Sequence, residues 1–375
     1  MDSGLEGVVA AETVLSHSDG ARGILWVRGR TLPELVADFG YEGTIALLWE
    51  GFAGSGLSRD EIRAQLGAGR TRAFARRGEW LERAAERPLT EGVRLALAML
   101  PETSLPAEIL STLPVAVAAL LGRRQDKAAL GPDPELDTAA DLLRMIHGRP
   151  VPAMAAALDA YFTAVIDNGL NTSAFTARLV ASTGASLASA ALGAYCAFTG
   201  PLHGGAPGPT LDMLDEAEAS GDVAAWAERK LAAGARLMGF GHRVFRFGDP
   251  RAAALAEALR RLGPSLGPGA GRLAFAAEVE RQVAAAFARV KPGRPPLQPN
   301  IEINAALLLD AVGLPREAFT PVFAIARGAG WLAHAMEQSK SGRLIRPSSA
   351  YIGPIPAGSE APAESVDNVY SSDQR

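Results

Sequence analysis

Apolar residues recur every three to four positions along most of this chain, a spacing typical of amphipathic helices. Gly, Pro and Ser interrupt the pattern at helix-length intervals from Leu32 onward. Helices are expected over 42–52, 58–67, 71–86, 90–100, 106–122, 134–147 and 151–167. A second block, richer in charge, predicts helices over 208–219, 222–238, 249–262, 271–290, 300–309 and 317–339. The pattern therefore predicts an all-α protein.

The two ends of the chain depart from this pattern. Short β-type runs at 7–10 and 23–27 flank a turn-rich segment at 17–20, which predicts a small N-terminal β-hairpin with His17 solvated in its turn. The tail 354–375 is rich in Pro, Ser, Ala and Asp without periodicity. We expect this tail to be disordered or to embrace a partner.

One stretch, 179–202, carries no charged residue and is long enough to span a bilayer. Its many Ala, Ser and Thr residues make it only modestly hydrophobic, so we interpret 172–198 as a single buried helix. Small residues recur along it at helical spacing, which lets two helix backbones approach closely. A central helix within one lobe and a helix in a subunit interface both fit this pattern.

Length and composition limit the number of domains, the classes of partner and the compartment. The chain has 375 residues, which favours two domains or lobes. Its 37 basic and 41 acidic residues give a net charge of −4, which argues against nucleic acid or an anionic membrane as partner. Cys196 is the single cysteine, so no internal disulfide can form. Without a basic leader before an apolar segment, a cytoplasmic protein is expected.

Two of the five histidines lie in motifs that contain several glycines. His203 belongs to Gly-Pro-Leu-His-Gly-Gly at 200–205, and His242 follows Gly-Phe-Gly at 239–241. Glycine lets a substrate approach the ring closely, and a neutral imidazole can donate a hydrogen bond or move a proton. One such motif would be an ordinary turn. Two such motifs, with Arg251 nine residues after the second histidine, favour a functional site.

Three other charged residues stand in apolar or glycine-rich surroundings. Glu302, in the first turn of a helix, either offsets the helix dipole or acts as a base. Arg327 lies mid-helix with no acid within four residues, so it needs an anion from elsewhere in the fold or from a ligand. Arg251 could cap a helix start, and Arg346 is ordinarily a surface residue. Together these groups suit binding of a small di- or tricarboxylate and removal of a proton beside a carbonyl.

Motifs for other chemistries are absent from the sequence. We find no phosphate-binding loop, no zinc-ligand spacing and no nucleophile elbow. We therefore expect no metal and no permanently bound cofactor. The residues alone do not specify a reaction.

Five motifs in a fixed order do suggest a reaction. They are 200–205, 239–251, Pro-Asn-Ile-Glu at 299–302, Ala-Gly-Trp-Leu-Ala-His at 329–334, and 343–351. Jointly they resemble the citrate synthase family, above all its short bacterial citrate and 2-methylcitrate synthases, over nearly the whole chain.

The resemblance implies an architecture as well as an activity. It implies an almost all-helical, two-domain fold in an intimate homodimer, with 172–198 in the interface. The large domain would comprise 1–207 and 315–353, and the small domain 208–314.

The resemblance also implies roles for single residues. Glu302 resembles the base that deprotonates acetyl-CoA, His203 the donor to the enol, and His242 the group that polarises the ketone of oxaloacetate. Residues similar to the substrate's carboxylate clamps are Arg251, Arg327 and, from the neighbouring subunit, Arg346. Residues similar to coenzyme A contacts are Leu237, Met238, Gly239, Phe240, Gly241, Arg246 and Asn300. Hydrolysis of citryl-CoA would release citrate and CoA, with the thioester as co-substrate.

The chain departs from the family pattern in two respects, at position 302 and at positions 165 and 168. The usual base is aspartate, whereas this chain has Glu302, which we interpret as a subgroup trait because some short bacterial members resemble it there. Asn168 stands where the family places a substrate-binding histidine, and Val165 where another histidine is often found. An amide can donate a hydrogen bond but cannot become cationic. We expect weaker oxaloacetate binding or preference for another 2-oxo acid.

Alternatives to acetyl-CoA:oxaloacetate condensation stay open. A 2-methylcitrate synthase would use propionyl-CoA, and a related condensing enzyme would use a different 2-oxo acid. A non-catalytic paralogue would keep the fold and the dimer for binding or regulation.

Overall fold

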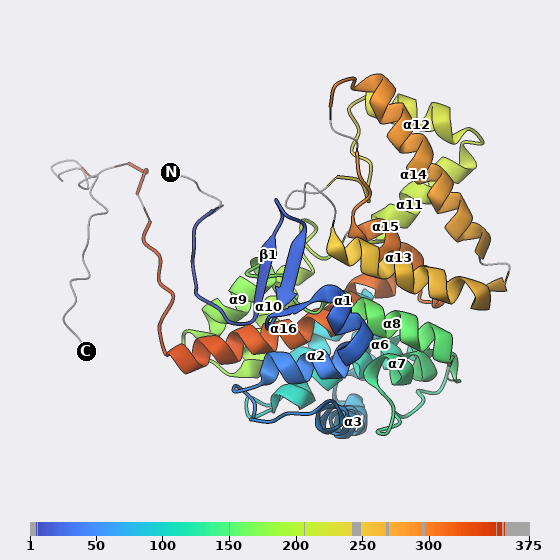
Figure 1. Ribbon diagram of the computed structural model, residues 1–375. Helices are drawn as coiled ribbons and strands as arrows, with labels where there is room; N and C mark the ends of the chain where they lie inside the picture. Colours follow the sequence, from blue (N-terminus) through green and yellow to red (C-terminus); the bar gives the residue numbers. More distant parts are fainter. Residues whose placement is uncertain are drawn as a thin grey trace.

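The computed structural model describes residues 5, 7–149, 151–205, 207–241, 249–267, 270–294, 297–349, 351–354 and 356. This part of the chain is mostly helical (Figure 1). The helices of its first half are α1 (Leu32–Glu34), α2 (Gly40–Trp49), α3 (Arg59–Ala75), α4 (Leu81–Ala85), α5 (Leu89–Ala98), α6 (Pro106–Arg124), α7 (Thr138–His147) and α8 (Pro152–Val165). Those of its second half are α9 (Thr172–Ala181), α10 (Leu187–Phe198), α11 (Pro207–Ala219), α12 (Val223–Ala232), α13 (Pro250–Leu262), α14 (Ala270–Val290), α15 (Ile301–Ala311) and α16 (Phe319–Ser341).

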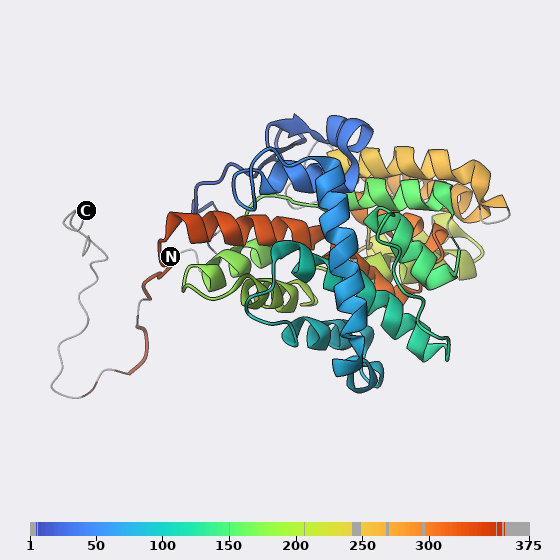
Figure 2. The same ribbon diagram turned by 90° about the horizontal axis from the view of Figure 1, so that it is seen from below.

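Helix α16 runs through the middle of the body, against α2, α6, α8, α9 and α10 (Figures 1 and 2). Almost every residue from Phe319 to Met336 is buried. Two side chains of α2 bind its backbone: Tyr41 donates to Ile325 O at 2.7 Å, and Trp49 donates to Ala329 O at 3.1 Å. The central helix of the fold is therefore α16.

Helices α11, α12, α14 and α15 gather in a lobe at one end of the body (Figure 1). Helix α13 packs both on α15 of this lobe and on α8 of the body. Residues that begin α13 and α15 consequently lie where the lobe meets the body.

The N-terminal sheet differs from the hairpin expected from the sequence. Strand β1 (Ser16–Asp19) pairs antiparallel with β2 (Ile24–Val27), which pairs with the short β3 (Arg30–Thr31). The run 7–10, expected to be a strand, is not one, because Val8 and Val9 find no apolar partner and stay exposed. His17 lies in β1 opposite Trp26, with the two rings 5.4 Å apart, and not in a turn.

The expected long helix 172–198 is also wrong, because it breaks into α9 and α10. Gly184 adopts φ +81°, and Ser186 caps the start of α10 by accepting a hydrogen bond from Ser189 N at 3.1 Å. In the part of the chain that the structure describes, the helix long and apolar enough to cross a membrane is α6, yet 78% of its most apolar window is buried inside the protein. Helix α6 is therefore a core helix.

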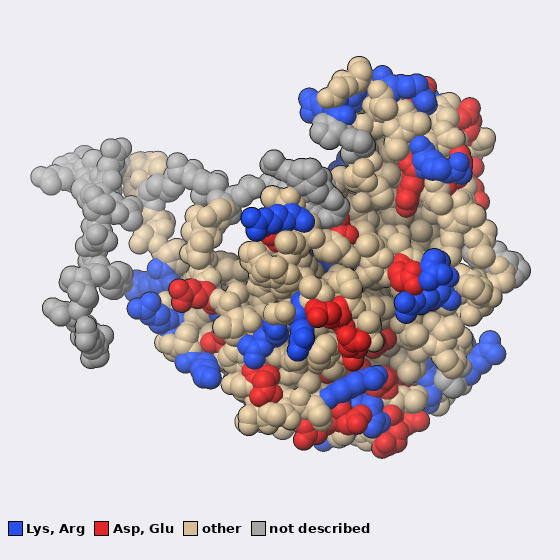
Figure 3. Space-filling view, in the orientation of Figure 1, with Lys and Arg blue, Asp and Glu red and all other residues tan. Residues whose placement is uncertain are grey.

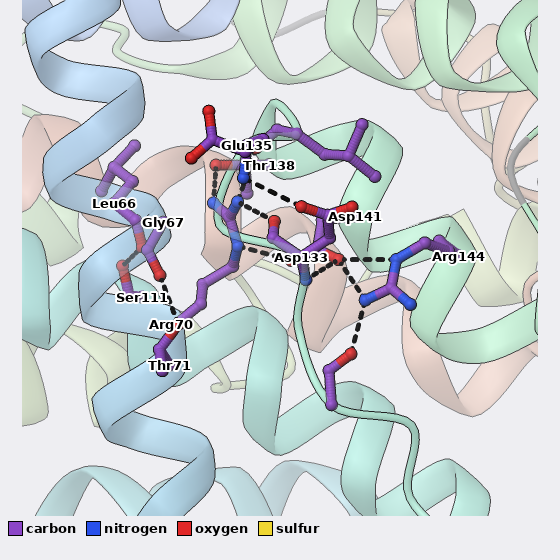
Figure 4. A network of polar contacts seen from close by, with 12 residues as sticks. Leu66, Gly67, Arg70, Thr71, Ser111, Asp133, Glu135, Thr138, Asp141 and Arg144 are labelled. Atoms are coloured by element: carbon purple, nitrogen blue, oxygen red, sulfur yellow. Dashed lines mark hydrogen bonds and ion pairs between the residues drawn. The ribbon is translucent and has the colours of Figure 1, made fainter.

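The sequence predicted a break between helices 58–67 and 71–86, but α3 runs unbroken through 68–70 and ends at Ala75, and α4 begins at Leu81. Gly67, within the helix, permits close approach of the loop before α7, since a Cβ there would lie 2.1 Å from Pro134 O. Arg70, one turn later, is 1% exposed and donates to Asp141 Oδ2 at 2.7 Å and to Leu136 O at 2.6 Å (Figure 4). Removing one partner of such a buried pair costs about 3–5 kcal/mol.

On the molecular face of Figure 3, basic and acidic side chains are interspersed among uncharged ones. Ion pairs join oppositely charged side chains at many points of the described chain, as in the contacts of Arg316 with Asp212 and Asp215. This face therefore offers no basic surface for a polyanion.

Candidate active site

Glu302 lies in the first turn of α15. Asn300 caps this helix by accepting a hydrogen bond from Glu302 N at 2.8 Å. Burial raises the pKa of Glu302 to about 7, although Arg251 and Arg327 act in the opposite direction. The side chain therefore changes between acid and carboxylate near neutral pH, as a general base requires.

Arg251 and Arg327 both act electrostatically on Glu302. Arg251, at the start of α13, is 6% exposed and forms a two-pronged pair with Asp249, at 2.9 and 2.7 Å. Arg327, on α16, donates to Val165 O at 2.8 Å. Burial lowers the pKa of Arg327 to about 10, so it stays cationic at neutral pH. Two guanidinium groups thus lie near one carboxyl group.

His203 is held by Ser173 at the start of α9. Its Nε2 lies 2.8 Å from Ser173 Oγ and 3.3 Å from Ser173 N. Because a backbone N–H can only donate, Nε2 accepts, and the ring proton is assigned to Nδ1. Burial, with the charge of Arg327, lowers the pKa of His203 to about 4. At neutral pH His203 is therefore a neutral imidazole that donates through Nδ1.

Ser173 is itself buried and well connected. Trp331 of α16 donates to its hydroxyl at 2.9 Å, and Asn171 Oδ1 lies 2.8 Å away as a second acceptor for its proton. The ring of His203 also contacts Phe198 edge-on, at 5.1 Å between centroids. The orientation of His203 is thus set by α9, α10 and α16 together.

The segment 237–241 pairs with the residues before α15. Gly241 N donates to Gln298 O, Asn300 N donates to Gly239 O, and Asn300 Nδ2 donates to Gly241 O, each at 2.8 Å. Gly239 adopts φ +80°, and a Cβ there would lie 2.4 Å from Ile303 Cγ1. Packing against α15, as well as ligand access, therefore requires this glycine.

The segment 237–241 is not helical, although the sequence predicted a helix to 238. Helix α12 ends at Ala232, and Gly234 follows with φ +68°. A cavity of about 220 Å³ adjoins the segment, and its lining residues include Asp212, Glu216, Lys230, Arg236, Leu237 and Met238. A second cavity of about 190 Å³, lined by residues such as Arg72, Met99 and Glu108, shares no lining residue with the first.

Asn168 follows α8 in the turn that leads to α9. Its Oδ1 is buried and has no hydrogen-bond partner among the described residues. Val165, three residues earlier, is buried and presents its carbonyl oxygen to Arg327. The turn that carries Asn168 is therefore attached to the arginine of α16.

One residue singled out from the sequence lies apart from this cluster, and two others cannot be placed relative to it. His242 and Arg246 lie outside the described residues. Arg346 is exposed on the extended segment after α16, which leads away from the body (Figure 1). Among the described residues no group of three or more His, Cys, Asp or Glu side chains could hold a metal ion.

Sequence reasoning missed the residues that hold the cluster in place. Asp249, which pairs with Arg251, could have been found from its position directly before Pro250 at a helix start. Ser173 gave no such signal, because its contact with His203 joins residues 30 positions apart.

Comparisons with known proteins agree on one family. The family profile described as "Citrate synthase, C-terminal domain" matches residues 4–348. The chain is 34% identical to a putative citrate synthase 2 of Mycobacterium tuberculosis, over 96% of this chain and 94% of that protein. It is also 30% identical to a 2-methylcitrate synthase of Mycobacterium tuberculosis, over 93% of this chain and 90% of that protein.

Solved structures share the fold. Citrate synthase from Thermotoga maritima matches with a TM-score of 0.80 and 28% identity, over 98% of this chain and 100% of that one. The citrate synthase of Thermoplasma acidophilum, in a ternary complex with carboxymethyl coenzyme A and oxaloacetate, matches with a TM-score of 0.81 and 23% identity, over 97% and 98% of the two chains. The chain belongs to the citrate synthase family of condensing acyltransferases.

Proposed function

We propose that this protein condenses acetyl-CoA with oxaloacetate and hydrolyses the resulting citryl-CoA to citrate and CoA. The observation that carries the proposal is the position of Glu302, a carboxyl group with a pKa near 7, beside Arg251 and Arg327. A base that is half ionised near neutral pH can remove the weakly acidic α-proton of a thioester. The two guanidinium groups supply the charge that a dicarboxylate substrate needs.

In this mechanism Glu302 takes a proton from the acetyl methyl group, and the electron pair of the C–H bond forms the enolate. His203 donates its Nδ1–H to the enolate oxygen and so stabilises the developing negative charge. The enolate carbon attacks the ketone of oxaloacetate, whose oxygen is polarised by His242. Water then cleaves the thioester of citryl-CoA, which releases citrate and the CoA thiol.

The oxaloacetate carboxylates would bind Arg251 and Arg327, with Asn168 contributing its amide. We assign coenzyme A to the segment Leu237, Met238, Gly239, Phe240 and Gly241, together with Arg246 and Asn300. Support comes from the hydrogen bonds between this segment and the residues that begin α15, which bring it next to Glu302. The thioester is a co-substrate, and no permanently bound cofactor is needed.

We further propose a homodimer in which Arg346 enters the neighbouring site. Arg346 is exposed and separate from the cluster of its own chain, so a partner is needed to make it a clamp. Helices α9 and α10 are the proposed interface, in keeping with the exposed Leu179 on α9. In this arrangement 208–314 forms the small domain that closes over the substrates, and 1–207 with 315–353 forms the large one. A cytoplasmic location fits the single cysteine.

Propionyl-CoA is the alternative acyl donor, because relatives of both specificities have about the same similarity to this chain. A non-catalytic role is disfavoured by the combination at Glu302 of a raised pKa with the charges of Arg251 and Arg327, because a raised pKa alone also occurs at the structural carboxyl group of Asp159.

Release of the CoA thiol tests the proposal directly. Purified protein is mixed with acetyl-CoA or propionyl-CoA and with oxaloacetate or another 2-oxo acid, and Glu302→Gln is the matched control. We expect thiol release that requires both substrates and is lost in the control. Absence of release with every pair would favour the non-catalytic paralogue. Light scattering coupled to gel filtration, on the wild type and on Arg346→Ala, tests the dimer and the contribution of its partner's arginine.

A further inference from the structure

The turn 165–169, which carries Asn168, is fastened to α16 at three successive levels of that helix. Arg327 donates to Val165 O at 2.8 Å. Gly330, one turn later, leaves no room for a side chain, since a Cβ would lie 2.7 Å from Ile166 O. His334, a further turn along, has Nε2 3.3 Å from Asp167 Oδ2. Helix α16 therefore both carries Arg327, the proposed substrate arginine, and holds the turn 165–169 in place.

His334 is fully buried, and its hydrogen-bond partners define its orientation. Arg178 Nε donates to Nδ1 of His334 at 3.1 Å. Because a guanidinium N–H can only donate, Nδ1 accepts, and the ring proton on Nε2 points to Asp167. Arg178 is held in turn by Gln338, through a 2.9 Å bond from Nη1 to Oε1, and by an ion pair with Glu337.

Asp167 is fully buried and receives a second donor from the N-terminal strand. Ser16 Oγ donates to Asp167 Oδ2 at 2.5 Å, and Gly169 N donates to Ser16 Oγ at 2.8 Å. The residues on both sides of Asn168 are therefore fixed by Ser16. Burial alone would raise the pKa of Asp167, but His334, Ser16 and Arg327 outweigh burial and hold this pKa below its usual range.

We propose that His334 is a positioning residue which, through Asp167, places the amide of Asn168 and so sets the affinity for the 2-oxo acid. The inference rests on the proposed function, because it takes Asn168 as a contact of that substrate. In this proposal His334 does not touch the substrate. Among the described residues its hydrogen bonds are to Asp167 and Arg178, and not to the segment 237–241 assigned to coenzyme A. It therefore acts on one substrate and leaves the other unaffected.

Two amide substitutions of His334 separate this role from simple packing. In His334→Gln the longer side chain places its amide nitrogen near the position of Nε2, so donation to Asp167 is retained. In His334→Asn the amide reaches only to the position of Nδ1, so the contact with Arg178 is retained and the contact with Asp167 is lost. A misplaced turn should raise KM for the 2-oxo acid about tenfold in His334→Asn. His334→Gln should stay within about threefold of wild type, with KM for the acyl thioester unchanged in both.

Ser16→Ala is a second test, which remains informative if the His334 variants do not fold. It removes one donor to Asp167, the Ser16 hydroxyl, which is also the acceptor for Gly169 N, and it should raise KM for the 2-oxo acid in the same direction. Ser111→Ala is the matched control, because its buried hydroxyl donates to Leu66 O between α3 and α6 and not to the turn. This control should leave both KM values as in the wild type.

Two measurements test the inference. They are steady-state kinetics on both substrates and the melting temperature of each variant in the presence and absence of oxaloacetate. A selective rise in KM for the 2-oxo acid, with a smaller stabilisation by oxaloacetate in His334→Asn than in His334→Gln, supports the inference. Equal rises in both KM values, or a loss confined to kcat, would overturn it while leaving the proposed function intact. A wild-type protein that neither turns over nor is stabilised by any 2-oxo acid would end both.

Discussion

The hydroxyl of Ser173 lies 2.8 Å from Nε2 of His203. This contact joins the start of α9 to the loop before α11. The neighbouring backbone N–H makes Nε2 an acceptor, and the only ring proton is therefore on Nδ1. A fixed neutral tautomer matters for the proposed chemistry, because an imidazole free to rotate or to exchange tautomers would not present a donor to the enolate.

Ser173→Ala tests this relationship. The substitution removes the hydroxyl from His203 and leaves the buried Trp331 N–H without its acceptor. We expect kcat to fall about tenfold with little change in either KM, since only the transition-state donor is loosened. Loss of the Trp331 contact should lower the free energy of unfolding by about 1–3 kcal/mol.

Kinetics of thiol release and denaturant unfolding measure the two effects of Ser173→Ala separately. Thr183→Ala is a suitable control, because that exposed hydroxyl donates to Val180 O at the end of the same helix. A variant with unaltered kcat would show that Ser173 does not orient His203 for catalysis.

Glu302 should control the pH dependence of activity. Its pKa is raised to about 7, and the base must be ionised to accept a proton. The value of kcat/KM should therefore rise through pH 7 as the fraction of carboxylate increases. Glu302→Gln should lose activity by a factor of about 10²–10⁴, because the amide cannot take the proton.

Glu302→Asp separates charge from reach. It keeps a carboxylate but withdraws it by one methylene, so kcat should fall about 10²-fold. The pH profile should still show one ionisation on its acid side. An aspartate variant as active as wild type would mean that the glutamate is not specifically required.

Asp159 should make the fold less stable as pH rises. It lies on α8, accepts a hydrogen bond from Tyr41 N at 3.2 Å, and has a pKa raised to about 7 by burial and by the charge of Glu42. Below the ordinary pKa of 3.8 the group is protonated in both the folded and the unfolded states. Between pH 4 and 7 the unfolded chain ionises first, so stability decreases over this window.

Asp159→Asn removes this penalty, since an amide can accept the same hydrogen bond without ionising. At pH 8 the variant should be more stable than wild type by up to about 4 kcal/mol. At pH 4 the two proteins should unfold at the same denaturant concentration. Urea unfolding at several pH values measures the difference, and a pH-independent difference would contradict the assignment.

The helical periodicity predicted most helices, and the failures have identifiable physical causes. A glycine has the same appearance in a sequence whether it ends a helix or admits a neighbour. Gly67 lies inside α3, where it admits the loop before α7, whereas Gly184 ends the stretch that was expected to be one helix. The choice depends on tertiary contacts that local spacing does not contain.

The candidate site likewise contains residues that the sequence indicates and residues that only tertiary contacts reveal. Glu302, Arg251 and Arg327 stand out in the sequence as charges in unusual surroundings, and the structure brings them together. Asp167 and His334 do not stand out, because their significance is a contact between residues 167 positions apart. The family resemblance indicated the reaction, whereas the residues that support the site are recognised only from their tertiary contacts.

Asn168→His addresses the largest departure from the family pattern. Asn168 Oδ1 is buried without a partner among the described residues, next to the Asp167 that Ser16 and His334 hold in place. A histidine there adds a donor that can become cationic, which favours a dicarboxylate. We expect KM for oxaloacetate to fall about tenfold, with KM for the acyl thioester unchanged. Kinetics with a panel of 2-oxo acids measure whether selectivity shifts toward oxaloacetate, and an unchanged KM would show that Asn168 does not limit binding of this substrate.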